Sequence, residues 1–153
     1  MPNLSNLLDG SSIIDLRSPA RQADVFQALA ERLSVRSGVS ISDIIAAFEA
    51  RAQEATIGVG DGVALAHARL PGVERAIGAF ARLSSPLDVD AHDERRCDLV
   101  FALLTSSDAD AVHLKALAQI SRTFVDSELR AALRRGEQNV AELLLGRQRG
   151  AAA

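Results

Sequence analysis

The feature that most constrains the fold is an unbroken apolar run, Leu-Val-Phe-Ala-Leu-Leu, at residues 99–104. A β-strand turns successive side chains to opposite faces of its sheet, so a strand of this composition needs apolar cover on both faces. Segments with helical spacing of apolar residues lie before and after the run. We therefore predict an α/β (α+β) sandwich, in which helices flank a mixed central β-sheet. The 153 residues fit a single domain, assigned here to 1–150, with 151–153 as a frayed tail.

Capping residues and apolar spacing predict the other elements. Ser18 and Pro19 predict the start of a helix that ends at Gly38, and Ser40 predicts the start of a second helix that ends near residues 51–54. The remaining predicted strands are 13–16, 63–66 and 75–83, and the remaining predicted helices are 108–124, 127–135 and 139–145.

Composition excludes several classes of protein. The chain has 17 Lys and Arg against 20 Asp and Glu, so it has no basic surplus for binding a nucleic-acid backbone. No stretch approaches the roughly 18 uninterrupted apolar residues of a membrane span, and the N-terminus lacks the features of a secretory signal. Cys97 is the single cysteine, which fits a reducing compartment. We expect a cytoplasmic protein with no nucleic-acid partner and no membrane insertion.

Two histidines and one arginine stand out as candidate functional residues. His67 follows a glycine-rich segment at residues 58–62, and we expect it where a short strand meets a turn. The glycines could form an anion-binding nest of N–H groups, or simply a tight turn beside a loop histidine. His113 shares its predicted helix face with apolar residues, so it points inward as a site residue or as an ordinary core histidine. Arg51 could bind a phosphoryl group or cap its helix.

Cofactor sites find little support in the sequence. The three histidines and Cys97 show no short metal-ligand spacing such as HxH or HExxH. The glycine-rich segment matches neither the dinucleotide fingerprint nor the P-loop. We expect neither a metal nor a cofactor.

Four segments, taken in chain order, carry a resemblance to a known family. Residues 58–72 read GVGDGVALAHARLPG, 98–104 read DLVFALL, 113–118 read HLKALA and 4–8 read LSNLL. Together they resemble enzyme IIA of the fructose/mannitol type (the EIIA type-2 domain) of the bacterial phosphoenolpyruvate-dependent phosphotransferase system. The nearest branch is the stand-alone nitrogen-regulatory one.

The resemblance implies a role for each candidate residue. His67 corresponds to the histidine that is phosphorylated on Nε2, His113 to the second active-site histidine, and Arg51 to the arginine that stabilises the phosphate. Thr56 and Arg69 are the further binding residues that we expect. The resemblance also implies a small phosphohistidine carrier (an HPr-like protein) as the phosphate donor, and regulatory proteins as targets.

The sequence leaves other functions open. Ala66 stands where the family usually has proline, which leaves open a binding module that kept the fold without being phosphorylated. An IIA component of a sugar-transporting system is a further alternative. A hydrolase or metal site built on His67 and His113 is a third, although the chain has no convincing nucleophilic Ser or Cys. The sequence predicts neither the oligomeric state nor whether phosphorylation activates or blocks the targets.

The residues beside His67 in sequence predict the character of its surface. Leu65, Ala66, Ala68, Leu70 and Pro71 are apolar, and Arg69 is the one charge among them. We therefore expect an apolar docking surface whose affinity for partners depends on the charge of the phosphoryl group.

Overall fold

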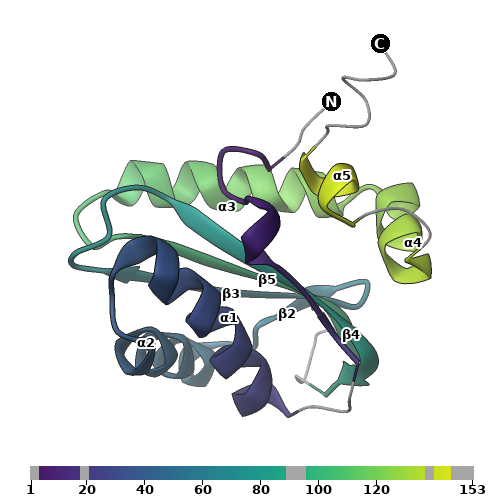
Figure 1. Cartoon of the computed structure of the whole chain (residues 1–153), viewed down its shortest axis with the longest axis horizontal. Helices are drawn as coiled ribbons and strands as arrows, with labels where there is room; N and C mark the ends of the chain where they lie inside the picture. Colours follow the sequence, from purple (N-terminus) through teal and green to yellow (C-terminus); the bar gives the residue numbers. More distant parts are fainter. Residues whose placement is uncertain (1–3, 18–20, 89–95, 137–139, 146–153) are drawn as a thin grey trace.

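The computed structural model of the chain describes residues 4–17, 21–88, 96–136 and 140–145 (Figure 1). Within these residues, five strands form one sheet and five α-helices cover it. The strands are β1 (Ile13–Leu16), β2 (Gly58–Gly60), β3 (Val63–Leu70), β4 (Ile77–Leu87) and β5 (Cys97–Ser106). The helices are α1 (Gln22–Ser37), α2 (Ile41–Glu54), α3 (Asp110–Phe124), α4 (Ser127–Arg135) and α5 (Val140–Leu145), and a short 3₁₀ helix, η1 (Gly10–Ser12), precedes β1.

The sheet is mixed and has the strand order β1-β4-β5-β3-β2. β3 runs parallel to β5 and β1 parallel to β4, whereas β4 is antiparallel to β5 and β2 antiparallel to β3. α1 and α2 cover one face of the sheet, and α3, α4 and α5 lie on the other (Figure 1). This architecture confirms the predicted fold class.

β5 is the strand that the apolar run predicted, and its side chains at 99–104 are fully buried. Leu99, Phe101 and Leu103 pack into the cluster beneath α3. The alternate side chains, Val100, Ala102 and Leu104, pack into the cluster beneath α1 and α2. Burial of apolar surface stabilises the folded state by about 25 cal/mol per Å². Because β5 buries such surface on both faces, it forms the centre of the core. Cys97, the first residue of β5, is also buried, as its small apolar character predicts.

The helix boundaries follow from local capping. α1 begins at Gln22, later than predicted, and the expected start at Ser18 and Pro19 lies outside the described residues. α1 ends at Gly38, whose φ of 78° suits glycine. α2 begins after Ser40, whose side chain accepts a hydrogen bond from the N–H of Asp43, as predicted.

Later elements differ from prediction mainly at their ends. β3 continues to Leu70, and β4 continues to Leu87 through the Ser-Ser-Pro segment that we expected to close it. α3 begins at Asp110 rather than 108, because Ser106 and Asp108 form a hydrogen-bonded turn before it. Among the described residues, no helix combines the length and the apolar character that crossing a bilayer requires.

The shortness of β2 decides where a site can open. β2 pairs with β3 only through Val63 and Ala64. The N–H of Leu65 still donates to the carbonyl of Ile57, and beyond it β3 pairs only with β5 among the described elements, so its C-terminal half forms an edge of the sheet. α2 and α3 lie on opposite faces at this edge. A side chain on this half of β3 can therefore be reached from both helical layers.

The N-terminal segment is held on the sheet by an arginine whose side chain is mostly buried. Arg36 on α1 donates from one nitrogen to the carbonyl oxygens of Leu7 and Gly78 and to the hydroxyl of Ser12, each at 2.9 Å. The N–H of Gly78 in turn donates to the carbonyl of Leu7 at 2.9 Å. The backbone at Gly78 is thus fixed between two partners and cannot move to make room for a larger residue.

We predict that Gly78→Ala destabilises the protein. A Cβ at this position would lie 2.7 and 2.8 Å from two ring atoms of Phe101, which is itself fully buried. Overpacking of this kind lowers the free energy of unfolding by about 1–3 kcal/mol, measured by urea unfolding followed by circular dichroism. Gly10→Ala is the matched control, because nothing lies within 4 Å of its Cβ. Equal stability of the two variants would contradict this account of the packing.

Candidate active site

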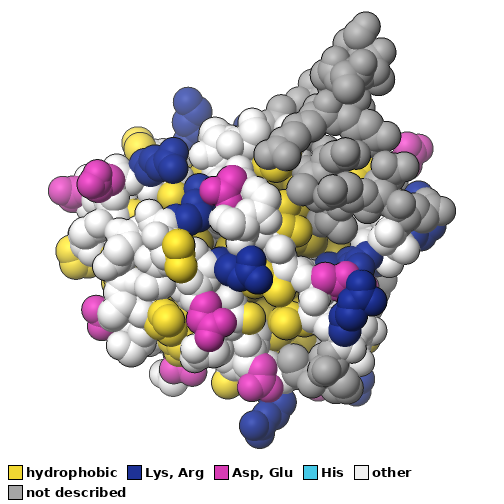
Figure 2. Space-filling view, viewed as in Figure 1, with side chains coloured by type: hydrophobic (Ala, Val, Ile, Leu, Met, Phe, Trp, Pro, Cys, Tyr) yellow, Lys and Arg dark blue, Asp and Glu magenta, His cyan; other side chains and the backbone are white. Residues whose placement is uncertain are grey.

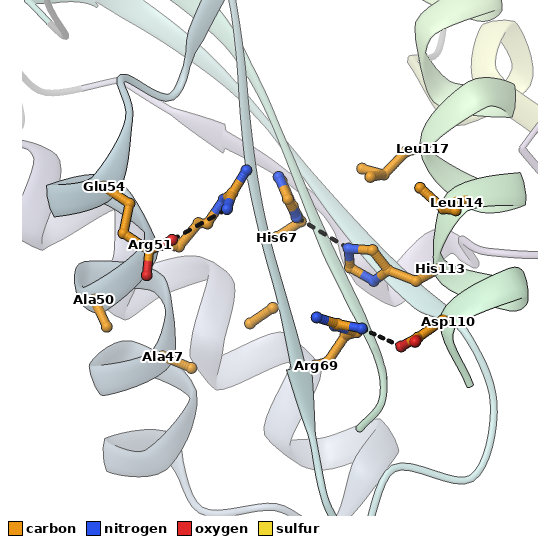
Figure 3. Close-up of a pocket in the computed structure, with 11 residues that line it drawn as sticks. Ala47, Ala50, Arg51, Glu54, His67, Arg69, Asp110, His113, Leu114 and Leu117 are labelled. Atoms are coloured by element: carbon orange, nitrogen blue, oxygen red, sulfur yellow. Dashed lines mark hydrogen bonds and ion pairs between the residues drawn. The ribbon is translucent and has the colours of Figure 1, made fainter. Parts of the chain in front are cut away.

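The candidate site is a pocket at the free edge of β3, between α2 and α3 (Figure 3). Its volume is about 610 Å³. The residues that line it are Ala47, Ala50, Arg51, Glu54, His67, Ala68, Arg69, Asp110, His113, Leu114 and Leu117. Both histidines singled out from the sequence, together with Arg51 and Arg69, are therefore brought to one pocket.

His67 lies within β3, not at the strand end where we expected it. The strand alternates, so Ala66 and Ala68 face the core beneath α1 and α2, whereas His67 faces α3. Its Nδ1 lies 3.0 Å from Nε2 of His113, within hydrogen-bond distance. Because Nδ1 has this partner, Nε2 is the ring nitrogen left to react in the pocket.

His113 is the buried member of the pair. It lies in the first turn of α3, on the inward face that the spacing predicted, which it shares with the buried residues Ile120 and Phe124. The two imidazole rings are tilted by 50° with centroids 5.1 Å apart. On the other side of the His113 ring, Nδ1 lies 2.6 Å from the hydroxyl oxygen of Thr105 on β5.

Two arginines reach the pocket from different elements, and each is paired with a carboxylate. Arg51 on α2 donates to Glu54 at 3.2 Å. Arg69 on β3 forms an ion pair with Asp110 at the start of α3. In Figure 3 the guanidinium of Arg51 extends toward the side of the His67 ring that faces away from His113. Positive charge therefore lies beside the free nitrogen of His67.

The environment keeps both imidazoles neutral at pH 7. Burial is the largest effect on His67, and with Arg51, His113 and Arg69 it lowers the pKa of His67 from 6.5 to about 4. Burial, then Arg69 and Arg51, also lower the pKa of His113, while Asp110 acts in the opposite direction. A neutral imidazole keeps a lone pair on one nitrogen, which is the form needed for a nucleophile.

The glycine-rich segment does not contribute to the pocket. Its residues form β2 and a tight turn at Asp61 and Gly62, where the φ values are 58° and 78°. Arg134 of α4 donates to the carbonyl of Asp61, so this turn faces α4 and not His67. The turn interpretation of the glycines is therefore correct, and the anion nest beside His67 is wrong.

Thr56 also lies away from the pocket lining. Its hydroxyl accepts a hydrogen bond from the N–H of Gly58 at 3.2 Å.

The surface beside His67 is also more charged than expected, because Arg51, Glu54 and Asp110 line it together with Arg69. The predicted apolar docking surface with a single nearby charge is therefore wrong, because four charged side chains line the pocket and Ala66 packs in the core.

Sequence reasoning missed three residues at the site. Glu54 and Asp110 hold the two arginines, and Thr105 contacts His113. Strand alternation along β5 places Thr105 on the same face as Leu103, and only the structure places α3 above it. The third histidine of the sequence, His92, lies outside the described residues.

The histidines of the pocket are not visible on the face of the molecule that Figure 2 shows. On that face, Lys, Arg, Asp and Glu side chains are scattered between apolar ones, and no described histidine is visible (Figure 2). Among the described residues, no group of three or more His, Cys, Asp or Glu side chains is arranged to hold a metal ion.

Comparison with known proteins finds relatives that match most of the chain. A nitrogen regulatory protein of Bradyrhizobium diazoefficiens is 34% identical over 131 residues, which cover 86% of each chain. A fructose-specific EIIA component of Haloferax volcanii is 33% identical, covering 82% of this chain and 84% of that one. The crystal structure of the nitrogen regulatory protein IIA-Ntr of Neisseria meningitidis superposes with a TM-score of 0.82 at 30% identity, over 91% of this chain and 94% of that one.

A family model covers almost all of the described structure. Residues 6–145 match the model for the phosphoenolpyruvate-dependent sugar phosphotransferase system, EIIA 2. The match extends from the N-terminal segment to the end of α5 and includes every residue of the pocket. This chain therefore belongs to the EIIA 2 family of the phosphoenolpyruvate-dependent sugar phosphotransferase system, and is a phosphotransferase component.

Proposed function

We propose that this chain is a phosphoryl carrier and regulator of the nitrogen-related phosphotransferase system, and that it accepts phosphate on Nε2 of His67. The observation that carries the proposal is the hydrogen-bonded pair of His67 and His113, with two arginines at the same pocket. The relatives named as nitrogen regulatory proteins support the branch. The donor would be the phosphohistidine of a small HPr-like carrier protein, and the location cytoplasmic.

The pairing of the histidines makes His67 a directed nucleophile. When Nδ1 of His67 carries the hydrogen and donates it to Nε2 of His113, the lone pair lies on Nε2 of His67. The low pKa of His67 keeps that lone pair unprotonated at neutral pH. Arg51, beside this nitrogen, disfavours a proton there but favours an incoming phosphoryl group.

The transfer exchanges one N–P bond for another. The Nε2 lone pair of His67 attacks phosphorus, and the N–P bond of the donor phosphohistidine breaks with its electron pair returning to the donor ring. The proton on Nδ1 of His67 stays in the hydrogen bond to His113. Such a reaction needs alignment and compensation of the phosphoryl charge, which Arg51 and Arg69 can supply.

Phosphorylation would also change the charge that a target protein meets. With neutral histidines, the two arginines and the two carboxylates of the pocket cancel. A phosphoryl group adds about −1.5 to −2 charges, taking phosphoserine as the guide. The arginines can turn from Glu54 and Asp110 to the phosphoryl oxygens, which leaves uncompensated carboxylates at the rim. Regulatory targets therefore meet very different charges on the unphosphorylated and the phosphorylated protein.

Ala66 does not displace His67 from this geometry. It is buried in β3, in register with Ala102 of β5, and the strand continues through His67 to Leu70. The pocket keeps its paired histidines in this backbone. This observation favours a carrier over a binding module that has lost phosphorylation.

The first prediction from the proposed function concerns the acceptor. Incubated with phosphoenolpyruvate and the two upstream carriers, the protein should gain one acid-labile, base-stable phosphate, measured as intact mass. His67→Ala should gain none, while its melting temperature stays close to that of the wild type. Labelling of His67→Ala at the wild-type level would exclude His67 as the acceptor.

The second prediction concerns the supporting residues. His113→Ala and Arg51→Lys should slow phosphorylation by about 100-fold, because each removes a placed donor or the planar fork of a guanidinium, yet both should reach full stoichiometry. Arg122→Lys on the exposed side of α3 is the control and should react normally. Normal rates in both pocket variants would contradict these roles, and would leave Arg51 as a helix cap and His113 as an ordinary core histidine.

The third prediction follows from the pKa of His67. The ring should titrate near pH 4 in NMR spectra of the folded protein, and Arg51→Gln should raise this midpoint by removing a nearby positive charge. Because the pKa in the unfolded chain is near 6.5, the unfolded state binds more protons between these values. Stability from the neutral ring is therefore present above about pH 6.5 and is lost as the pH falls toward 4. A midpoint at 6.5 in the folded protein would contradict the described electrostatics.

A further inference from the structure

A buried hydroxyl continues the hydrogen-bonded chain of the two histidines. Thr105 lies on β5 beneath α3 and is fully buried. Its Oγ1 is 2.6 Å from Nδ1 of His113, and Nε2 of the same ring is 3.0 Å from Nδ1 of His67. Within the described part of the chain, His113 is the hydrogen-bond partner of this hydroxyl.

Positive charge must develop on this chain of groups during transfer. A neutral His67 that bonds to phosphorus through Nε2 while keeping its Nδ1 hydrogen becomes a cationic ring. Its Nδ1 proton then becomes more acidic and shifts toward Nε2 of His113, which takes up positive charge. A charged His113 carries hydrogen on both nitrogens, so its Nδ1–H needs an acceptor.

We propose that Thr105 is a positioning residue whose hydroxyl accepts the Nδ1–H of His113 and stabilises that ring while it shares the positive charge of His67. The proposal rests on the proposed function of His67. Bond formation between Nε2 of His67 and phosphorus, and cleavage of the donor N–P bond, stay as described above. The proposal adds the movement of the proton between His67 and His113. The Thr105 hydroxyl stabilises His113 during this movement, from the opposite side of the His113 ring.

A hydroxyl oxygen suits this place because Nδ1 of His113 carries a hydrogen in both states of the ring. His113 accepts from His67 through Nε2, so the neutral ring keeps its own hydrogen on Nδ1 and donates it to Oγ1 of Thr105. This hydrogen bond strengthens when the ring becomes charged, because a charged donor makes a stronger hydrogen bond than a neutral one. Loss of the acceptor therefore costs the charged ring more free energy than the neutral ring.

The surrounding charges make this support necessary. Arg51 from α2 and Arg69 from β3 both disfavour positive charge on His113, and burial acts in the same direction. Asp110 on α3 is the opposing charge, but it is exposed and paired with Arg69. Thr105 contacts His113 directly and from the buried side.

The fourth prediction compares three variants in the full chain. Thr105→Val keeps the shape and removes the hydroxyl, whereas Thr105→Ser keeps the hydroxyl. Thr123→Val is the matched control, because Thr123 is a buried threonine of α3 whose hydroxyl donates to the carbonyl of Gln119. Two quantities are measured: the rate of phosphorylation by the upstream carriers, and the His113 pKa from NMR titration of the unphosphorylated protein.

Thr105→Val should phosphorylate about 10-fold more slowly, and its His113 pKa should fall, because the charged ring loses its acceptor. Thr105→Ser should stay within about twofold of wild type, and Thr123→Val should leave both quantities unchanged. A wild-type rate and pKa in Thr105→Val would overturn the proposal, as would Thr105→Ser behaving like Thr105→Val. If the wild type accepts no phosphate, the proposed function fails, and the His113 pKa alone then decides the role of Thr105.

Discussion

The buried strand β5 is the constraint on which the site depends. Its side chains pack on both faces, so its position is fixed between the two helical layers. β3 pairs with it in parallel and places His67 opposite Leu103. Two residues further along β5, Thr105 faces the same layer, and α3 follows after a short turn and lays His113 above both. One strand thus sets the distances among three side chains from three elements.

A phosphoryl carrier also needs an acceptor histidine that a partner can reach, and the open edge of β3 provides this access. A histidine deep in the sheet would be neutral but unreachable, and one on an exposed loop would be reachable but protonated near its ordinary pKa. The early end of β2 leaves His67 half-buried between α2 and α3. Burial and two arginines can then lower its pKa while the pocket stays open to a partner.

The sequence predicted the fold class, the inward direction of His113 and most elements, because these depend on local spacing of apolar residues. It placed His67 at a strand end, since the apolar run after Val63 is interrupted by the histidine itself, although the strand continues to Leu70. The carboxylate partners of Arg51 and Arg69 were not predicted. One is a short-range helix contact and the other joins β3 to α3, and neither follows from composition.

The glycine-rich segment shows why a motif can be found correctly and explained wrongly. Its glycines allow the tight turn between β2 and β3, with positive φ at Gly60 and Gly62, and this turn packs near Arg134 rather than near His67. The segment still matters for the site, because the short hairpin that it forms leaves the rest of β3 uncovered. The segment therefore makes His67 accessible, whereas the positive charge of the pocket comes from the arginines.

The central claim is that the pairing of His67 with His113 leaves Nε2 of His67 as the atom that takes the phosphoryl group. The most direct measurement is NMR of the phosphorylated protein with ¹⁵N in its histidine rings, which identifies the nitrogen bonded to phosphorus. The account predicts phosphorus on Nε2 of His67, with Nδ1 still hydrogen-bonded to His113. Phosphorus on Nδ1 of His67, or on His113, would contradict it.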